Sequence, residues 1–304
     1  MPPTSTTGGR CPVREALREA FGDADVEGFI HVRDVDGGAE IGLGADEPVV
    51  LASVFKVPIV LEYARQAAAG TLERTERLTV TAADKDGGIG TSGCADDVSL
   101  TLRDLAHFMM TMSDNAATDV LLRRVGLGNL HATLRELGLE RTRLIGGCAE
   151  LLGSVAVELG LSGGQGVSDE EALAGVSEDR IRALSVMDPE RTTSGTPREI
   201  TTLLSKIWRD EAGPPEACAE VRRIMGSQIW PHRLSSGFGD EVKVSGKTGT
   251  LWGVRNEAGV VEYPDGRRYA VAVFLRTGSL GLRLPKADRV IGHAARVAID
   301  HLRE

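Results

Sequence analysis

Lysine is scarce in this chain, and positive charge is in the minority. Only six of the 304 residues are lysines, and 44 acidic residues outnumber 35 basic ones, which leaves a formal net charge of −9. An excess of negative charge repels a phosphate backbone, so we expect no nucleic acid partner. No apolar run approaches the length of a membrane-spanning helix, so we expect no membrane partner either.

The sequence also lacks the patterns of metal and redox sites. The four cysteines are scattered without a C-x-x-C pair, which argues against zinc and thioredoxin-type sites. The six histidines show no H-E-x-x-H or comparable ligand spacing. We therefore expect no metal or other cofactor. The cysteines are expected to be free thiols: Cys11, Cys94, Cys148 and Cys218.

No secretion signal is visible at the beginning of the sequence. The chain starts MPPTSTTGGRCPVREAL, without the basic stretch and the following apolar run of a secretory signal. As written, it is expected to be cytoplasmic, although a trimmed secreted protein would begin in the same way. Residues 1–12 are expected to form a flexible lead-in.

What is present indicates a globular α+β protein. Hydrophobic residues make up 41% and charged residues 26%, which is ordinary for a soluble fold. Alternating segments at 28–35 and 39–44 flank a Gly-rich turn and predict a β-hairpin. Further strands are expected at 241–250, 256–263 and 268–275.

Helical patterns fill the middle of the chain and close it. They occur just after Ser53 up to Gly70, and at about 99–112, 116–125, 129–137, 197–212 and 287–303. We therefore expect an antiparallel sheet flanked by helices, with an inserted all-helical lobe. The sheet lobe would comprise residues 1–55 and 197–304. The helical lobe would comprise 56–196 and contain a long loop insertion at about 146–185, where Gly, Ser and acidic residues are frequent.

Three short motifs that can carry chemistry follow one another along the chain. The first is Ser53-Val54-Phe55-Lys56, at the start of an apolar helix. Lys56 lies one turn after Ser53, so the two side chains share a face. A serine hydroxyl needs an adjacent base to act as a nucleophile, and a buried lysine with a lowered pKa can serve as that base.

The second motif, Ser113-Asp114-Asn115, follows the helix at about 99–112. Serine, aspartate and asparagine are ordinary turn and cap residues, so this motif by itself indicates little. In a catalytic role, the Ser113 hydroxyl would relay a proton. The Asn115 amide would bind a substrate carbonyl.

The third motif, Lys247-Thr248-Gly249, lies on a predicted strand and is followed by Thr250. Lysine and threonine can bind a carboxylate by charge and hydrogen bonding. Gly249 has no side chain, so a substrate could approach the backbone. The backbone N–H groups of Thr250 and Ser53 could then form an oxyanion hole.

Together the motifs resemble those of class A β-lactamases and penicillin-binding proteins, in which S-x-x-K, S-D-N and K-T-G occur in this order. The stretches LASVFKVPIVLEYA, TMSDNAATDVLL and SGKTGTLWGVRNE are similar to that family, and the resemblance covers roughly 13–145 and 185–304. It implies a serine hydrolase of the β-lactamase-like fold that forms an acyl-enzyme, with a small carboxylate-bearing acyl compound as its substrate.

The resemblance also implies a role for each residue. Ser53 would be the acylated nucleophile, Lys56 its base or proton relay, and Ser113 the donor to the leaving nitrogen. The remaining residues would bind the substrate: Asn115, Lys247, Thr248, Gly249, Thr250 and Arg255. Arg255, just beyond the third motif, resembles an arginine that assists carboxylate binding in many relatives.

The resemblance breaks where the family places E-x-x-L-N, whose glutamate activates the deacylating water. After Thr142-Arg143-Leu144 this chain reads IGGCAELLG and continues into the insertion. Glu150 is the nearest acidic residue, but no asparagine follows it at the family's spacing. Other acidic residues could be brought in by the insertion: Glu158, Asp169, Glu170 or Glu171. The acylation half of the site is therefore complete, whereas the deacylation half is displaced, rebuilt or missing.

Three functions are compatible with this pattern. The first, which the motifs favour, is hydrolysis of a β-lactam amide. The second is a cytoplasmic esterase or biosynthetic tailoring hydrolase of the same fold, which the absent export signal favours. The third is a β-lactam-binding module that is acylated without turnover. An α/β-hydrolase triad is disfavoured because no G-x-S-x-G segment occurs.

Overall fold

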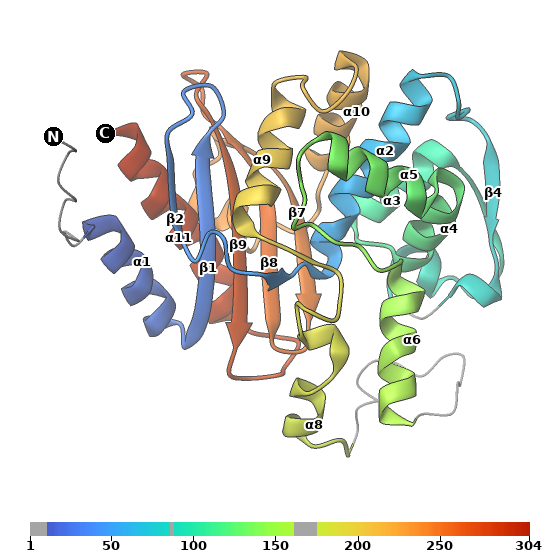
Figure 1. Ribbon diagram of the computed structural model, residues 1–304, viewed down its shortest axis with the longest axis horizontal. Coiled ribbons are helices and arrows are strands. Elements are labelled where there is room, and N and C mark those ends of the chain that lie inside the picture. The colour runs from blue at the N-terminus through green and yellow to red at the C-terminus, as the bar shows by residue number, and fades with distance from the viewer. Residues whose placement is uncertain (1–10, 86–87, 161–174) are drawn as a thin grey trace, which may run out of the picture.

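A five-stranded antiparallel sheet forms the centre of the molecule (Figure 1). The computed structural model describes residues 11–85, 88–160 and 175–304. The strand order is β2-β1-β9-β8-β7. The strands are β1 (Val26–Asp34), β2 (Glu40–Leu43), β7 (Lys243–Leu251), β8 (Val254–Glu262) and β9 (Arg268–Thr277). Because β1 pairs along its whole length with β9, the two ends of the chain share one sheet. The predicted α+β fold with an antiparallel sheet is confirmed.

Two helices from opposite ends of the chain cover one face of this sheet (Figure 1). They are α1 (Pro12–Asp23) and α11 (Pro285–Arg303). The buried residues of α11 recur every three or four positions, from Val290 and Ile291 to Ala298 and Ile299. This spacing places them on one side of the helix, where they pack against alternate residues of the strands.

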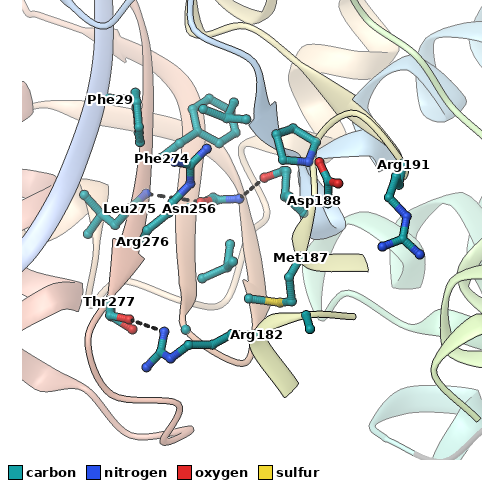
Figure 2. Close-up of a pocket in the computed structure, with 16 residues that line it drawn as sticks. Phe29, Arg182, Met187, Asp188, Arg191, Asn256, Phe274, Leu275, Arg276 and Thr277 are labelled. Carbon is teal, nitrogen blue, oxygen red and sulfur yellow. Dashed lines mark hydrogen bonds between the residues drawn. The ribbon is translucent and has the colours of Figure 1, made fainter. Parts of the chain in front are cut away.

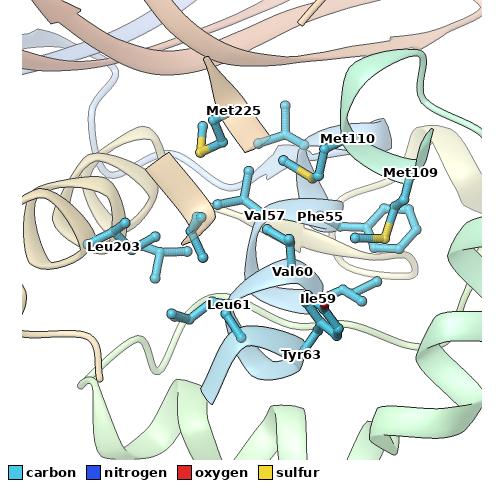
Figure 3. Packing of buried hydrophobic residues seen from close by; sticks show 14 of the residues in the cluster. Phe55, Val57, Ile59, Val60, Leu61, Tyr63, Met109, Met110, Leu203 and Met225 are labelled. Carbon is cyan, nitrogen blue, oxygen red and sulfur yellow. The ribbon is translucent and has the colours of Figure 1, made fainter. Parts of the chain in front are cut away.

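The other face of the sheet carries the larger core, which extends into the helical part of the molecule. Helix α9 (Pro197–Trp208) packs directly on β1, β8 and β9, and α10 (Pro215–Met225) lies between α9 and the helices beyond. Helix α2 (Lys56–Ala68) runs through the middle of this core and has no exposed side before residue 65. Figure 3 shows its apolar residues surrounded by Met109, Met110, Leu203 and Met225. A helix that is apolar all round has to be enclosed by other elements.

The remaining helices lie farther from the sheet. They are α3 (Leu102–Thr111), α4 (Asn115–Val125), α5 (Leu127–Glu136), α6 (Cys148–Leu159) and α8 (Glu178–Arg182). Strands β4 (Arg77–Val80) and β5 (Val98–Thr101) form an outlying pair. Strand β3 (Val49–Val50) pairs with β6 (Ser194–Gly195) just before the first motif.

The region 146–185 differs in part from the predicted long loop. Helix α6 occupies twelve of its residues, and Glu150 accepts a hydrogen bond from the Gly147 N–H at the start of that helix. Residues 161–174 of the expected insertion, and residues 1–10 of the expected lead-in, lie outside the described part of the chain. No helix in the described ranges combines the length and the apolar composition needed to cross a membrane.

Candidate active site

Ser53 lies at the junction between the sheet and the helical core. It sits in a single 3₁₀ turn, Ala52–Phe55, which leads directly into α2. Ala52 has a positive φ of 45°, a conformation that costs energy in a residue with a side chain. Ser53 itself is half-buried and lines an open cleft. The strained backbone therefore adjoins the proposed nucleophile.

Lys56 brings the first two motifs together. It begins α2 and is fully buried, yet its ammonium group has three polar partners. Its Nζ donates to the Ser113 carbonyl oxygen at 2.8 Å, to the Ser113 hydroxyl at 3.2 Å and to Asn115 Oδ1 at 2.9 Å. One side chain thus connects the turn that carries Ser53 with the start of α4.

A second fully buried lysine lies close to the first. Lys247 on β7 donates to the carbonyl oxygen of Thr248 at 2.9 Å. Burial lowers the pKa of Lys56 below its usual range. Burial, and next to it repulsion from Lys56, holds the pKa of Lys247 well below the ordinary lysine value. Two lysines in one dry region favour a neutral amine, which can accept a proton.

The second motif is held in place by its central aspartate. Asp114 is fully buried and caps α4 by accepting from the Ala117 N–H at 3.0 Å. It also accepts from the Thr91 N–H at 2.5 Å and the Ser92 hydroxyl at 3.2 Å, which attaches the neighbouring loop to the helix. Ser113, just before it, has a positive φ of 67°. Asp114 therefore positions Ser113 and Asn115 without facing the cleft.

Gly249 allows β7 to lie against the turn that carries Ser53. A Cβ atom at this position would lie 2.8 Å from the Leu51 carbonyl oxygen and 3.2 Å from the Ala52 side chain. Side-chain carbons do not approach a carbonyl oxygen that closely. The absent side chain was expected to leave room for a substrate, but the neighbouring chain segment occupies that space.

Two threonines of β7 and an arginine from outside the motifs line the cleft. Thr248 and Thr250 both face it. The Thr250 hydroxyl accepts from Arg233 Nη2 at 2.8 Å. Arg233 is nearly buried and is held by Asp288, whose Oδ1 accepts from its Nε at 2.8 Å. Its guanidinium group therefore adds positive charge beside the end of β7.

The structure does not bring Arg255 to this cleft. Its side chain is fully buried and donates from Nη1 to the carbonyl oxygens of Leu251 and Val254. Its Nη2 donates to the Gly281 carbonyl oxygen at 2.7 Å. Arg255 thus holds the turn after β7, while Arg233 occupies the position that was expected for it.

The cleft has a volume of about 360 Å³. None of the described residues around it is Asp or Glu. Its walls include Ser53, Ser113, Asn115, Thr248 and Thr250 together with these further residues: Gly88, Ile89, Met112, Trp230, His232, Arg233, Leu251, Trp252 and Leu282. In the part of the chain that the structure describes, no three His, Cys, Asp or Glu side chains gather in a way that could hold a metal ion.

A thiol lies directly behind Lys56 and Asn115. Cys148 begins α6, is almost fully buried, and its Sγ lies 3.2 Å from Asn115 Oδ1. The backbone N–H groups of Cys148 and Ala149 donate to the carboxylate of Asp119 at 2.6 and 2.8 Å, which fixes α6 to α4. Burial raises the pKa of the Cys148 thiol to about 11, so the thiol is protonated near neutral pH.

The two acidic candidates that the structure describes, Glu150 and Glu158, do not reach this position. Glu150 is exposed and caps α6. Glu158 accepts from the Ser185 N–H at 2.9 Å, at the far end of the same helix. Asp169, Glu170 and Glu171 lie outside the described residues.

The comparisons with known proteins agree with this architecture. The model of a family described as the β-lactamase enzyme family matches residues 12–302. The chain belongs to that family. Its similarity extends over nearly the whole sequence, including the region in which E-x-x-L-N is replaced.

The proteins to which this chain is similar carry different names, and one of them is named as a regulatory protein. The chain is 28% identical to the β-lactamase regulatory protein BlaB of Streptomyces cacaoi, over 95% of this chain and 96% of that protein. A β-lactamase from Sphaerobacter thermophilus DSM 20745 shares 25% identity with a TM-score of 0.73, over 95% of this chain and 96% of the other. PBP-A shares 21% identity with a TM-score of 0.75, over 96% of each chain.

Two residues of this β-lactamase-family site were not among those predicted from the sequence. Cys148 lies four residues after Leu144, inside the segment that replaces E-x-x-L-N. This short distance from Leu144 is the sequence signal that could have identified Cys148 as a residue of the site. Arg233 lies in a segment without a motif or periodicity. Only the folded chain brings it to Thr250.

Replacing Gly249 by Ala should lower the stability of the protein and displace Ser53. The added methyl group would meet the Leu51 carbonyl oxygen, so the cost should be about 1–3 kcal/mol, as for other overpacked sites. Denaturant unfolding measures this change. The matched control is Gly153→Ala in α6, where the new Cβ meets nothing within 4 Å and should stabilise the helix by up to about 1 kcal/mol. Equal stability of the two variants would contradict this role of Gly249.

Proposed function

We propose that Ser53 is acylated by a β-lactam or a related carboxylate-bearing acyl compound, and that the acyl-enzyme is then released slowly. The observation that carries this proposal is the position of the Lys56 amine. It lies one turn after Ser53 and within 3.2 Å of the Ser113 hydroxyl. Its burial lowers its pKa, which favours the neutral form that a base requires.

The contact between Lys56 and Ser113 supports the second half of the proposed proton path. The Ser53 hydroxyl gives its proton to the Lys56 amine as Oγ bonds to the carbonyl carbon of the substrate. When the amide C–N bond breaks, the leaving nitrogen takes a proton from the Ser113 hydroxyl. Lys56 then returns a proton to Ser113 along the 3.2 Å contact. Asn115, which also touches Lys56, is available to bind the substrate carbonyl.

The far end of the cleft suits a carboxylate. Thr248 and Thr250 offer hydroxyl donors, and Arg233 adds a guanidinium group beside Thr250. Lys247, which was expected to bind the carboxylate, is not among the described residues that line the cleft; its amine is fully buried and donates to the Thr248 carbonyl oxygen. A small anion therefore fits here better than a neutral substrate.

Slow release is inferred from the residue behind Lys56. Deacylation needs a base that activates water, and the described cleft lining contains no carboxylate. Cys148 occupies the space beside Asn115 and is a protonated thiol, which cannot serve as that base. The relative from Streptomyces cacaoi is named as a regulatory protein, and one neighbouring structure is a PBP-A mutant in an acyl-enzyme complex with penicillin-G. Both agree with a protein that keeps its acyl group.

Penicillin-G should add one acyl mass to the native protein and none to Ser53→Ala. Intact-mass spectrometry, followed over time, detects the adduct, and peptide mapping locates it. Lys56→Ala should slow adduct formation almost as strongly, because nucleophile and base act as one unit. Circular dichroism of both variants checks that they fold. An adduct on folded Ser53→Ala would contradict the assignment of the nucleophile.

The rate of acylation should fall as the pH falls. Only neutral Lys56 accepts a proton, and because burial lowers its pKa, the amine becomes protonated only below the usual lysine range of about 10.4. The rate should therefore be high at alkaline pH and decline through a midpoint well below that value. Stopped-flow measurement of acylation across the pH range tests this, and a midpoint at the ordinary lysine value would argue against Lys56 as the base.

Cys148→Glu should shorten the lifetime of the acyl-enzyme. A carboxylate beside Lys56 and Asn115 could activate water, and general base catalysis is worth about 10²–10⁴-fold. The matched control is Cys148→Gln, which has the same size and no basic oxygen. The decay of the adduct is followed by mass spectrometry in both variants.

Equal lifetimes of these two variants would contradict the role of Cys148. Rapid hydrolysis by the native protein would show a working deacylation site and would make turnover of β-lactams its function. If neither an adduct nor hydrolysis occurs with β-lactams, an esterase or tailoring hydrolase becomes the better hypothesis for the function. Small carboxylate-bearing esters are then the next substrates to test.

A further inference from the structure

A second cavity lies on the other side of the chain segment that leads to Ser53. Its volume is about 490 Å³, and it shares no lining residue with the cleft. One wall is formed by the ends of β1, β8 and β9, and the opposite wall by residues 182–191 that follow α8 (Figure 2). A volume of this size is within the range of small-molecule sites.

The inner surface of this cavity is apolar. Phe29 and Phe274 are neighbours on β1 and β9 at the sheet side, and Met187 lies on the opposite wall (Figure 2). Val49 and Val50 of β3 complete this part of the lining. These side chains could enclose an alkyl or aryl group.

The charges around the cavity are mainly positive, in a chain whose formal net charge is −9. Three guanidinium groups and one carboxylate line it: Arg182, Arg191, Arg276 and Asp188. The Arg276 guanidinium lies 4.9 Å from the centre of the Phe29 ring, at the apolar end. Arg182 extends across the lower side, whereas the Arg191 guanidinium points away from the others (Figure 2).

The guanidinium groups of Arg276 and Arg182 are partly exposed and use only some of their five N–H donors. Arg182 donates to the carbonyl oxygens of Thr277 and Gly278, and Arg276 donates to the Pro48 carbonyl oxygen at 3.5 Å. Their acidic partners are loosely held: Arg276 lies 3.3 Å from Glu27, and Arg182 lies 3.6 Å from Glu178. Charge-assisted hydrogen bonds between such groups are usually about 2.7–2.9 Å long. These carboxylates are also more than half exposed, so water weakens the pairing. A ligand carboxylate could therefore compete for both guanidinium groups.

We propose that this cavity is a second binding site, and that its ligand is a small organic carboxylate with an apolar body. The carboxylate would lie between Arg276 and Arg182, and the apolar body against Phe29, Phe274 and Met187. This assignment goes beyond the proposed acylation of Ser53 and does not depend on it.

Binding in the cavity would reach Ser53 through a shared wall. Asn256 lines the cavity, and its Nδ2 donates to the carbonyl oxygens of Val50 and Leu51 at 2.9 and 3.1 Å (Figure 2). Asn256 also pairs in register with Gly249, which lies against the Ser53 turn. A ligand that presses on Val50 or Asn256 would therefore change the position of the nucleophile.

Octanoate is a suitable probe for binding to the full, unacylated chain by isothermal titration calorimetry. Octanamide has the same body without the charge, and acetate has the charge without the body. Octanoate should bind with at least about tenfold higher affinity than either, because only octanoate uses both features of the cavity. Equal affinity for octanoate and acetate, or no binding of octanoate, would overturn the proposal.

Variants locate the bound octanoate. The double variant Arg182→Gln/Arg276→Gln should lower its affinity about tenfold or more. Arg123→Gln, on α4 and outside both lining sets, is the matched control and should leave the affinity unchanged. Arg233→Gln tests whether octanoate binds in the cleft instead. Loss of binding in Arg233→Gln, with retention in the double variant, would overturn the assignment to the second cavity.

The link to Ser53 is measured separately. Saturating octanoate should change the rate of acylation by penicillin-G in the native protein and leave it unchanged in the double variant. An unchanged rate in the native protein with octanoate bound would refute the link through Asn256. Because binding is measured without acylation, failure of the acylation chemistry would leave the binding result interpretable.

Discussion

The hydrogen bonds of one buried ammonium group connect the parts of this structure. Lys56 is enclosed by apolar residues at the start of the central helix, so its amine must find partners inside the protein. Its partners are Ser113 and Asn115, which belong to another helix and its preceding turn. Loss of these partners would leave a polar amine without hydrogen bonds in a dry core, so the same contacts that order the core also hold the residues of the candidate site together.

The placement of Ser53 is determined from both sides of its turn. Asn256 holds the Val50 and Leu51 carbonyl groups, and Gly249 lets β7 approach the same segment. As a result, Ser53, the proposed nucleophile, lies between two cavities, one lined by the motif residues and one lined by arginines and aromatic rings. A strained residue, Ala52, directly precedes it, as is common where structure serves function.

The proposed function separates acylation from deacylation within this β-lactamase-family protein. The groups that would promote acylation of Ser53 converge around Lys56, whereas the position beside Asn115 carries a thiol. The raised pKa of Cys148 keeps that thiol neutral, which suits its burial next to a lysine. Under the proposed function, this one side chain would decide whether the acyl group is released or retained.

The sequence by itself determined the sheet, most of the long helices and the three motifs, because these depend on local patterns. The hairpin around Gly37, the closing helix and the capping of α3 by Thr101 follow from periodicity and cap residues over a few positions. Helix α6 was missed since its sequence is apolar without a clear period and lies in a Gly-rich region. Helix α10 and the outlying pair β4 and β5 are short elements that tertiary packing stabilises.

Only the tertiary structure decided which residues surround Ser53. Arg255 pairs with Thr250 across β7 and β8, but the guanidinium group that donates to the Thr250 hydroxyl is that of Arg233, 17 positions earlier in the chain. The tertiary structure gave Gly249 a packing role, and it brought Cys148 to Asn115, 33 residues away in the chain. Such contacts join segments distant in sequence, and they depend on how helices and strands pack rather than on which residues are neighbours along the chain.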